Sequence, residues 1–148
     1  MKTKWVALAA LSMGLVGTGA AQAGDVTVTL TGVQARGGEL LVTLQSEGQF
    51  MQRAGFGQRV ENPGVGDVTV TFIDVPAGDY AVSVLHDQNG DGQMQVSEIG
   101  IPTEGWAMSH GAELRGPPTF AQVKVAIPAA GAALTEPMFY WDGRIPGQ

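Results

Sequence analysis

One twelve-residue segment holds the side chains whose spacing suggests a definite chemistry. It runs from Asp87 to Glu98, reads DQNGDGQMQVSE, and matches the pattern D-x-[DN]-x-[DN]-G-x5-E at every specified position. In such loops, oxygens at positions one, three and five surround a hard cation and a glycine at position six allows a sharp turn. A glutamate at position twelve then closes the site with two oxygens. The segment therefore predicts a Ca²⁺ site.

Six residues of this segment are the predicted ligands: Asp87, Asn89, Asp91 and Glu98 through their side chains, Gln93 through its carbonyl, and Gln95 through a water. Three formal charges in an exported chain predict a weak site, with a Kd of about 10⁻⁴ to 10⁻³ M. The alternative is an empty turn, because Asn-Gly and Asp-Gly are favoured hairpin dipeptides and the segment contains both. The carboxylates of Asp87 and Glu98 favour calcium, because a simple turn requires neither.

Enzyme chemistry has little support in the sequence. The chain has no cysteine, which excludes a thiolate nucleophile and a thiolate metal site. Ser109 and His110 are adjacent, and neighbours in sequence rarely orient as nucleophile and base. His86 and His110 lack a defined third ligand for a transition metal. We therefore predict a non-catalytic protein.

The elements that position these residues are expected to follow an export leader. Lys2 and Lys4 precede an apolar stretch, and Ala21-Gln22-Ala23 has the small-x-small form that a signal peptidase accepts. The prediction is a signal peptide over residues 1–23 and one domain over residues 24–148, exported to the periplasm or the external medium. A membrane anchor is the alternative, but a spanning helix needs about 20 predominantly apolar residues. We therefore predict no membrane insertion after cleavage.

Composition and charge narrow the function classes further. The chain has 148 residues, of which 44% are hydrophobic, and this suits a single globular domain. The formal net charge is -6, and it becomes -8 when Lys2 and Lys4 leave with the leader. With no basic stripe for phosphate contacts, nucleic acid is excluded as a partner. Because disulfides are impossible here, a metal would be a natural supplement to the core.

Two-residue alternation of apolar and polar side chains predicts strands along the domain. Residues 26–30, 68–72 and 123–127 alternate, whereas residues 40–44 and 80–85 are apolar on both faces and indicate more central strands. The aromatic segment 138–141 is the predicted last strand. Since no convincing amphipathic helix is present, the fold class is all-β: an antiparallel β-sandwich of about seven strands.

The predicted connections are rich in glycine and proline. Residues 36–39 predict a hairpin between the first two strands, and residues 74–80 predict a tight turn in which Gly78 takes a positive φ. Residues 47–66 are long for a structureless loop, and we expect a short helix over residues 50–54. Residues 100–118 are expected to be irregular.

Three blocks carry a resemblance to a known family: His86-Asp87-x-Asn89-x-Asp91-Gly92, residues 100–106 (GIPTEGW) and residues 116–120 (GPPTF). With these blocks the chain resembles a bacterial family of small exported proteins of unknown function. The turn at residues 75–80 also resembles transthyretin-like and carboxypeptidase-regulatory sandwiches. The resemblance implies an immunoglobulin- or prealbumin-like sandwich made as a precursor, and no activity. Gln95 and His110 depart from the family pattern, which more often has an aspartate and an asparagine there.

Two functions of different class follow from these observations. In the first, the protein is a binding or accessory module in which Trp106, Met108 and His110 form a recognition surface beside the calcium loop. Its partner would be an unidentified protein or small molecule. In the second, the domain is purely structural or self-associating. A buried Trp106 would favour the structural role, and an exposed Trp106 beside Met108 in an apolar patch would favour binding.

Overall fold

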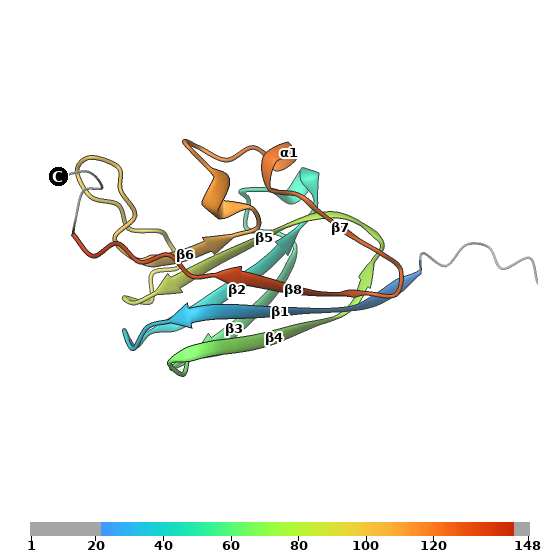
Figure 1. Ribbon diagram of the computed structural model, residues 1–148, viewed down its shortest axis with the longest axis horizontal. Helices are drawn as coiled ribbons and strands as arrows, with labels where there is room; N and C mark the ends of the chain where they lie inside the picture. Colours follow the sequence, from blue (N-terminus) through green and yellow to red (C-terminus); the bar gives the residue numbers. More distant parts are fainter. Residues whose placement is uncertain (1–21, 144–148) are drawn as a thin grey trace, which may run out of the picture.

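The computed structural model describes residues 22–143 and shows two β-sheets packed face to face (Figure 1). The first sheet has the order β4-β1-β8, formed by Gly66–Pro76, Ala23–Val33 and Ala132–Pro137. The second has the order β3-β2-β5-β6, formed by Phe56–Glu61, Glu39–Gln45, Gly78–Asp87 and Gly105–Met108, and β7 (Val125–Ile127) pairs with β5. The predicted all-β sandwich is confirmed. Residues 1–21 of the predicted leader lie outside the described residues.

Short helical turns complete this part of the chain. They are the 3₁₀ helices η1 (Glu47–Gln49) and η2 (Gly111–Glu113) and the four-residue helix α1 (Phe120–Val123). Within residues 22–143, no helix has the length and apolar character needed to cross a membrane.

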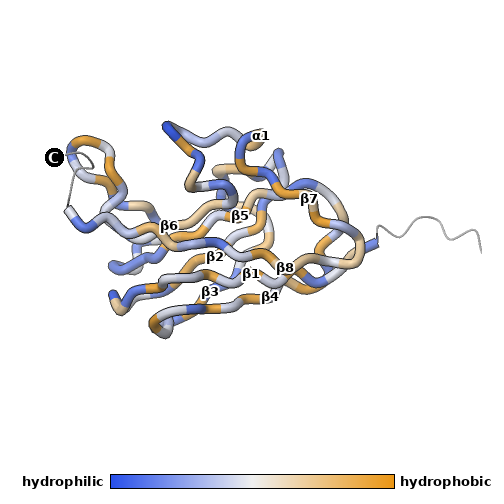
Figure 2. Tube along the Cα trace, viewed as in Figure 1, coloured by the Kyte–Doolittle hydropathy of each residue, from blue (hydrophilic) through white to orange (hydrophobic). Residues whose placement is uncertain are grey.

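The core lies between the two sheets and follows from the alternation in the sequence. In β1, Val26, Val28 and Leu30 are fully buried while the threonines between them face outward. Leu44 and Val82 belong to the same buried cluster and come from the second sheet. Figure 2 shows hydrophobic and hydrophilic residues alternating along the strands. Two faces that each lose apolar surface to the other provide the main drive for this packing.

The two strands predicted to be central, β2 and β5, are neighbours in the middle of the second sheet. Both strands have apolar residues on their two faces. One set of side chains fills the core, while Leu41 and Leu85 lie half-buried on the outer face.

The strand order differs from the expected arrangement at the C-terminal end. Every strand pair is antiparallel except one, because β8 runs parallel to β1. Eight strands are present in residues 22–143 rather than about seven. The last of them ends at Pro137, so the predicted strand over residues 138–141 is wrong. Instead, the backbone of Met138 bonds to Thr31 of the first sheet and that of Phe139 bonds to Trp106 of the second. This segment bridges the sheets at one end.

Several predicted connections also differ. The turn at residues 36–39 joins strands of different sheets and is not a hairpin, since β1 pairs with β4 and β8 only. Within the segment predicted as a turn, Asp74, which still belongs to β4, has the positive φ (53°), and Gly78, the first residue of β5, does not. No helix forms over residues 50–54, because the side-chain amide of Gln45 bonds to three carbonyls of that loop and η1 lies earlier. Val123 ends α1 instead of lying in a strand.

Candidate carboxylate site in the β5–β6 loop

The loop that joins β5 to β6 is organised by two buried carboxylates, one at each end. Asp87 is the last residue of β5 and has 0% exposure, and Glu104 directly precedes β6 and has 4% exposure. The oxygens of Asp87 accept hydrogen bonds from the backbone N–H groups of Gly90 (2.8 Å) and Gly92 (2.7 Å). Those of Glu104 accept from the N–H groups of Gln88 (2.9 Å) and Gln95 (3.2 Å).

A third carboxylate, Asp91, completes an acidic cluster at this end of the sandwich. One oxygen from each of Asp87, Asp91 and Glu104 lies within 4.8 Å of the others. Asp91 is exposed, and the side-chain amides of Asn89 and Gln95 both donate to its Oδ2. In residues 22–143, no ion pair to a basic side chain involves any of the three. The cluster therefore gathers negative charge without a basic side chain to balance it.

The structure brings together only part of the ligand set predicted from the sequence. Asp87 and Asp91 are in the cluster, and Asn89, Gln93 and Gln95 lie in the same loop. Glu98 is exposed and lies outside the acidic cluster. Glu104 lies in the cluster, although the twelve-residue pattern does not include it.

A small hairpin explains why Glu104, and not Glu98, lies in the cluster. Val96 pairs with Pro102, and the N–H of Thr103 bonds to the carbonyl of Gln95 (2.9 Å). Glu98 sits at the tip of this hairpin, and the return arm carries Glu104 back beside Gln95. In a helix-loop-helix site the exiting helix returns position twelve to the ion, and here no such helix follows. The sequence feature that could have pointed to Glu104 is its place directly before Gly105 and Trp106.

His86 supports the base of the loop from inside the sandwich. Its ring is fully buried, with Nε2 2.7 Å from the carbonyl of Gly37 and Nδ1 2.7 Å from the Tyr140 hydroxyl. Because a carbonyl only accepts, Nε2 carries the proton of the first bond. Gly38 has a φ of +64°, and a Cβ there would lie 2.2 Å from the Asp87 carbonyl oxygen. A Cβ at Gly105 would lie 2.1 Å from the Tyr140 ring. Both glycines are therefore required by close packing around His86.

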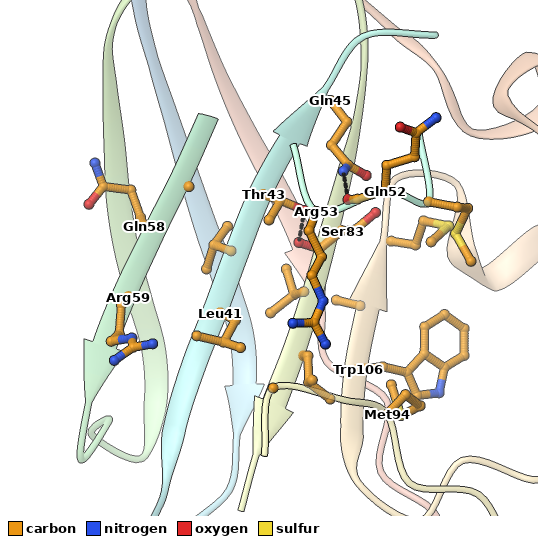
Figure 3. Close-up of a pocket in the computed structure, with 18 residues that line it drawn as sticks. Leu41, Thr43, Gln45, Gln52, Arg53, Gln58, Arg59, Ser83, Met94 and Trp106 are labelled. Atoms are coloured by element: carbon orange, nitrogen blue, oxygen red, sulfur yellow. Dashed lines mark hydrogen bonds between the residues drawn. The ribbon is translucent and has the colours of Figure 1, made fainter. Parts of the chain in front are cut away.

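The predicted recognition residues separate into two places. Trp106 and Met108 are half-buried and line a hollow on the outer face of the second sheet (Figure 3). The Trp106 ring also stacks on Phe139, with centroids 4.8 Å apart, so its exposure matches neither extreme considered above. His110 lies outside the residues that line this hollow. It has a positive φ of 57° and its Nδ1 is 3.7 Å from a carboxylate oxygen of Glu113.

The buried carboxyl of Glu136 in β8 should make the free energy of unfolding depend on pH. Burial raises its pKa above the ordinary value of 4.5, and the charge of His110 partly opposes this. A folded-state pKa above the unfolded one stabilises the fold at low pH, and this contribution is lost as pH rises past 4.5. Glu136→Gln should therefore be more stable than the wild type at pH 7 and no more stable near pH 4, measured by urea unfolding. A variant that is less stable at pH 7 would show that the charged carboxylate is favourably bound.

One comparison with known proteins finds a match over most of the described residues. Residues 28–134, from β1 to β8 and including the whole β5–β6 loop, match the family model described as "Uncharacterized protein conserved in bacteria (DUF2141)". No curated protein and no solved structure matches the chain. The resemblance to transthyretin-like sandwiches therefore stays a prediction. Because the match spans well over half of the chain, the protein belongs to this bacterial DUF2141 family.

Proposed function

We propose that the protein is an exported, non-catalytic binding or accessory module whose β5–β6 loop holds calcium and thereby fixes a neighbouring recognition surface. The observation that carries the proposal is the convergence of Asp87, Asp91 and Glu104, two of which are almost fully buried. The sequence of the leader supports export to the periplasm or beyond.

The geometry of the cluster suits a divalent ion. Calcium takes six to eight oxygens at about 2.3 to 2.6 Å, so two oxygens on one ion lie no more than about 5 Å apart. The three carboxylates meet this limit, since their atoms are within 4.8 Å of one another. Asp87 and Glu104 are also desolvated and repel each other, and a cation between them would offset both costs. Asn89 and Gln93 remain candidates for further oxygens of the same loop.

A non-catalytic role is supported by the hydrogen bonds of Ser109 and by the position of His110. The Ser109 hydroxyl is buried, accepts from the Val82 N–H and donates to the Val123 carbonyl. It is therefore committed to joining β5 with the end of α1. His110 faces Glu113 and does not contact this hydroxyl.

One observation favours the alternative, a structural domain with an empty loop. All four oxygens of Asp87 and Glu104 already accept backbone N–H groups. These bonds alone could hold the loop in its observed shape. The two proposals therefore differ in their response to calcium.

Calcium should raise the stability of the purified protein. With a Kd of about 10⁻⁴ to 10⁻³ M, 10 mM calcium should add roughly 1.4 to 2.7 kcal/mol to the free energy of unfolding measured in EDTA. Glu104→Gln should weaken calcium binding about tenfold or more, while its matched control Glu98→Gln should bind as the wild type does. Urea unfolding with and without calcium, together with calorimetric titration, measures both effects.

Two outcomes would contradict the proposal in different ways. Identical unfolding curves in EDTA and in calcium would leave the empty loop as the correct description. A loss of binding in Glu98→Gln but not in Glu104→Gln would restore the twelve-residue ligand set and remove Glu104 from it.

A further inference from the structure

The outer face of the second sheet carries a hollow that the calcium loop does not account for. Its volume is about 570 Å³, within the range of about 300 to 1,000 Å³ typical of small-molecule pockets. Alternation along the strands supplies its apolar floor, with Leu41 from β2, Leu85 from β5 and Trp106 from β6. Met51 and Met94 come from the two flanking loops. Figure 3 shows these side chains projecting from the strands and loops into one space.

Two guanidiniums line the hollow, those of Arg53 and Arg59, and Arg59 is paired with Glu39. Arg53 is exposed, lines the hollow, and in the view of Figure 3 reaches between the side chains of Leu41 and Trp106. The other described basic side chains have partners: Arg36 the Tyr140 ring, Arg59 Glu39, Arg115 carbonyls of its own loop, and Lys124 Asp79. Within residues 22–143, Arg53 is thus the one arginine or lysine whose side chain has no hydrogen bond, ion pair or ring contact.

A polar atom also lies in the floor of the hollow. The Ser83 hydroxyl is buried and has no hydrogen-bond partner in the described part of the chain. The hydroxyl of its neighbour Thr43 donates to the Ser83 carbonyl (3.2 Å) and has no hydrogen bond with the Ser83 hydroxyl. A buried hydroxyl without a partner is uncommon in folded proteins and favours an incoming oxygen.

We propose that this hollow binds a small organic carboxylate, with its apolar body against Leu41, Leu85 and Trp106 and its carboxylate at Arg53. Arginine pairs with a carboxylate through two parallel N–H bonds, and the apolar floor limits competition from water. The net charge of the chain is -6, so an arginine with no partner of any kind in the described residues is a local exception that favours an anion. The inference rests on the binding role proposed above, and its ligand is an organic anion bound in the hollow, separate from the calcium ion.

The body of the ligand is either a linear acyl chain or a flat aromatic ring, because both fit an apolar floor that contains an indole and several methionines. Four probes separate charge from shape: octanoate and octanamide, and 2-naphthoate and 2-naphthamide. Each amide keeps the apolar body and removes the negative charge. The carboxylate that binds more tightly identifies the shape of the body.

The test is calorimetric titration of the purified protein in EDTA and again in 1 mM calcium, so that a defect of the calcium loop is distinguished from a failure of this hollow to bind. At least one carboxylate should bind about tenfold more tightly than its amide, a difference of about 1.4 kcal/mol. Arg53→Gln should abolish this preference, and Lys124→Gln, which removes a positive charge outside the hollow, should retain it. Equal binding of acid and amide, retention of the preference in Arg53→Gln, or no binding of either acid at millimolar concentration would overturn the proposal.

Discussion

His86→Leu should lower the free energy of unfolding by about 2 to 4 kcal/mol, measured by urea denaturation in EDTA. Leucine fills a similar space but forms no hydrogen bond, so the carbonyl of Gly37 loses its partner and the Tyr140 hydroxyl keeps only the bond from the Gln34 N–H. Both bonds are 2.7 Å long and the imidazole is fully buried. Both bonds are part-buried, so water compensates for the lost partners only in part, and this is why the expected cost exceeds that of an ordinary surface bond.

Tyr140→Phe is the matched variant for this network. It keeps the ring that packs on Gly105 and on the Arg36 guanidinium, and removes only the hydroxyl. We expect a loss of about 1 to 2 kcal/mol, because the hydroxyl's two hydrogen bonds, with His86 and with the Gln34 N–H, disappear while the bond from His86 to Gly37 remains. If the two variants were equally stable, and both equal to the wild type, the network would not hold the base of the β5–β6 loop.

The consequence for function lies in the loop itself. His86 directly precedes Asp87, so a change that loosens the end of β5 moves the first carboxylate of the candidate site. Faster hydrogen exchange in residues 88–104 of His86→Leu, with the other sheet unchanged, would locate the effect there.

The core and the central strands could be predicted from the sequence because their signal is local. In β1 and β4, the alternation of apolar and polar residues indicates which face of the strand is buried. In β2 and β5, apolar residues on both faces indicate a central position in the sheet. The edge strand β3 carries no such pattern. Four of its six residues are polar or glycine, and only Phe56 and Val60 pack against the core.

Pairing direction could not be predicted, because a strand's own sequence does not specify its neighbour. The parallel pairing of β8 with β1 depends on a long excursion from β5 through β6 and α1 before the chain returns to the first sheet. The aromatic segment after β8 looked like a strand because its residues favour strands. Its backbone instead bonds to both sheets in turn, at Thr31 and at Trp106.

For the candidate site, the sequence predicted the loop but not all of its members. The glycines and Asp87 were recognised because their spacing is a local property of the chain. Glu104 was missed because it approaches Asp87 only after the hairpin over residues 95–103 has folded. Likewise, no spacing rule connects Arg53 with Trp106, which come from different parts of the chain and meet on one face of the sheet.

Phe72→Ala should cost about 3 to 5 kcal/mol in free energy of unfolding, whereas Ile73→Ala, one residue later, should cost less than about 1 kcal/mol. The two side chains lie in the same strand, β4, and point to opposite faces. Phe72 is 2% exposed and belongs to the cluster that also contains Leu44 and Val82 of the other sheet, and Ile73 is 60% exposed.

Urea unfolding of both variants measures the difference, and Ile73→Ala serves as the control for strand propensity, since both changes place alanine in β4. The contrast tests the sandwich directly. If the first sheet did not pack its inner face on the second, both side chains would lose about the same contact area and the two variants would unfold at similar urea concentrations. A large loss confined to Phe72→Ala requires that a second apolar layer cover that residue, because β4 and β1 alone cannot bury a phenylalanine on an open sheet face.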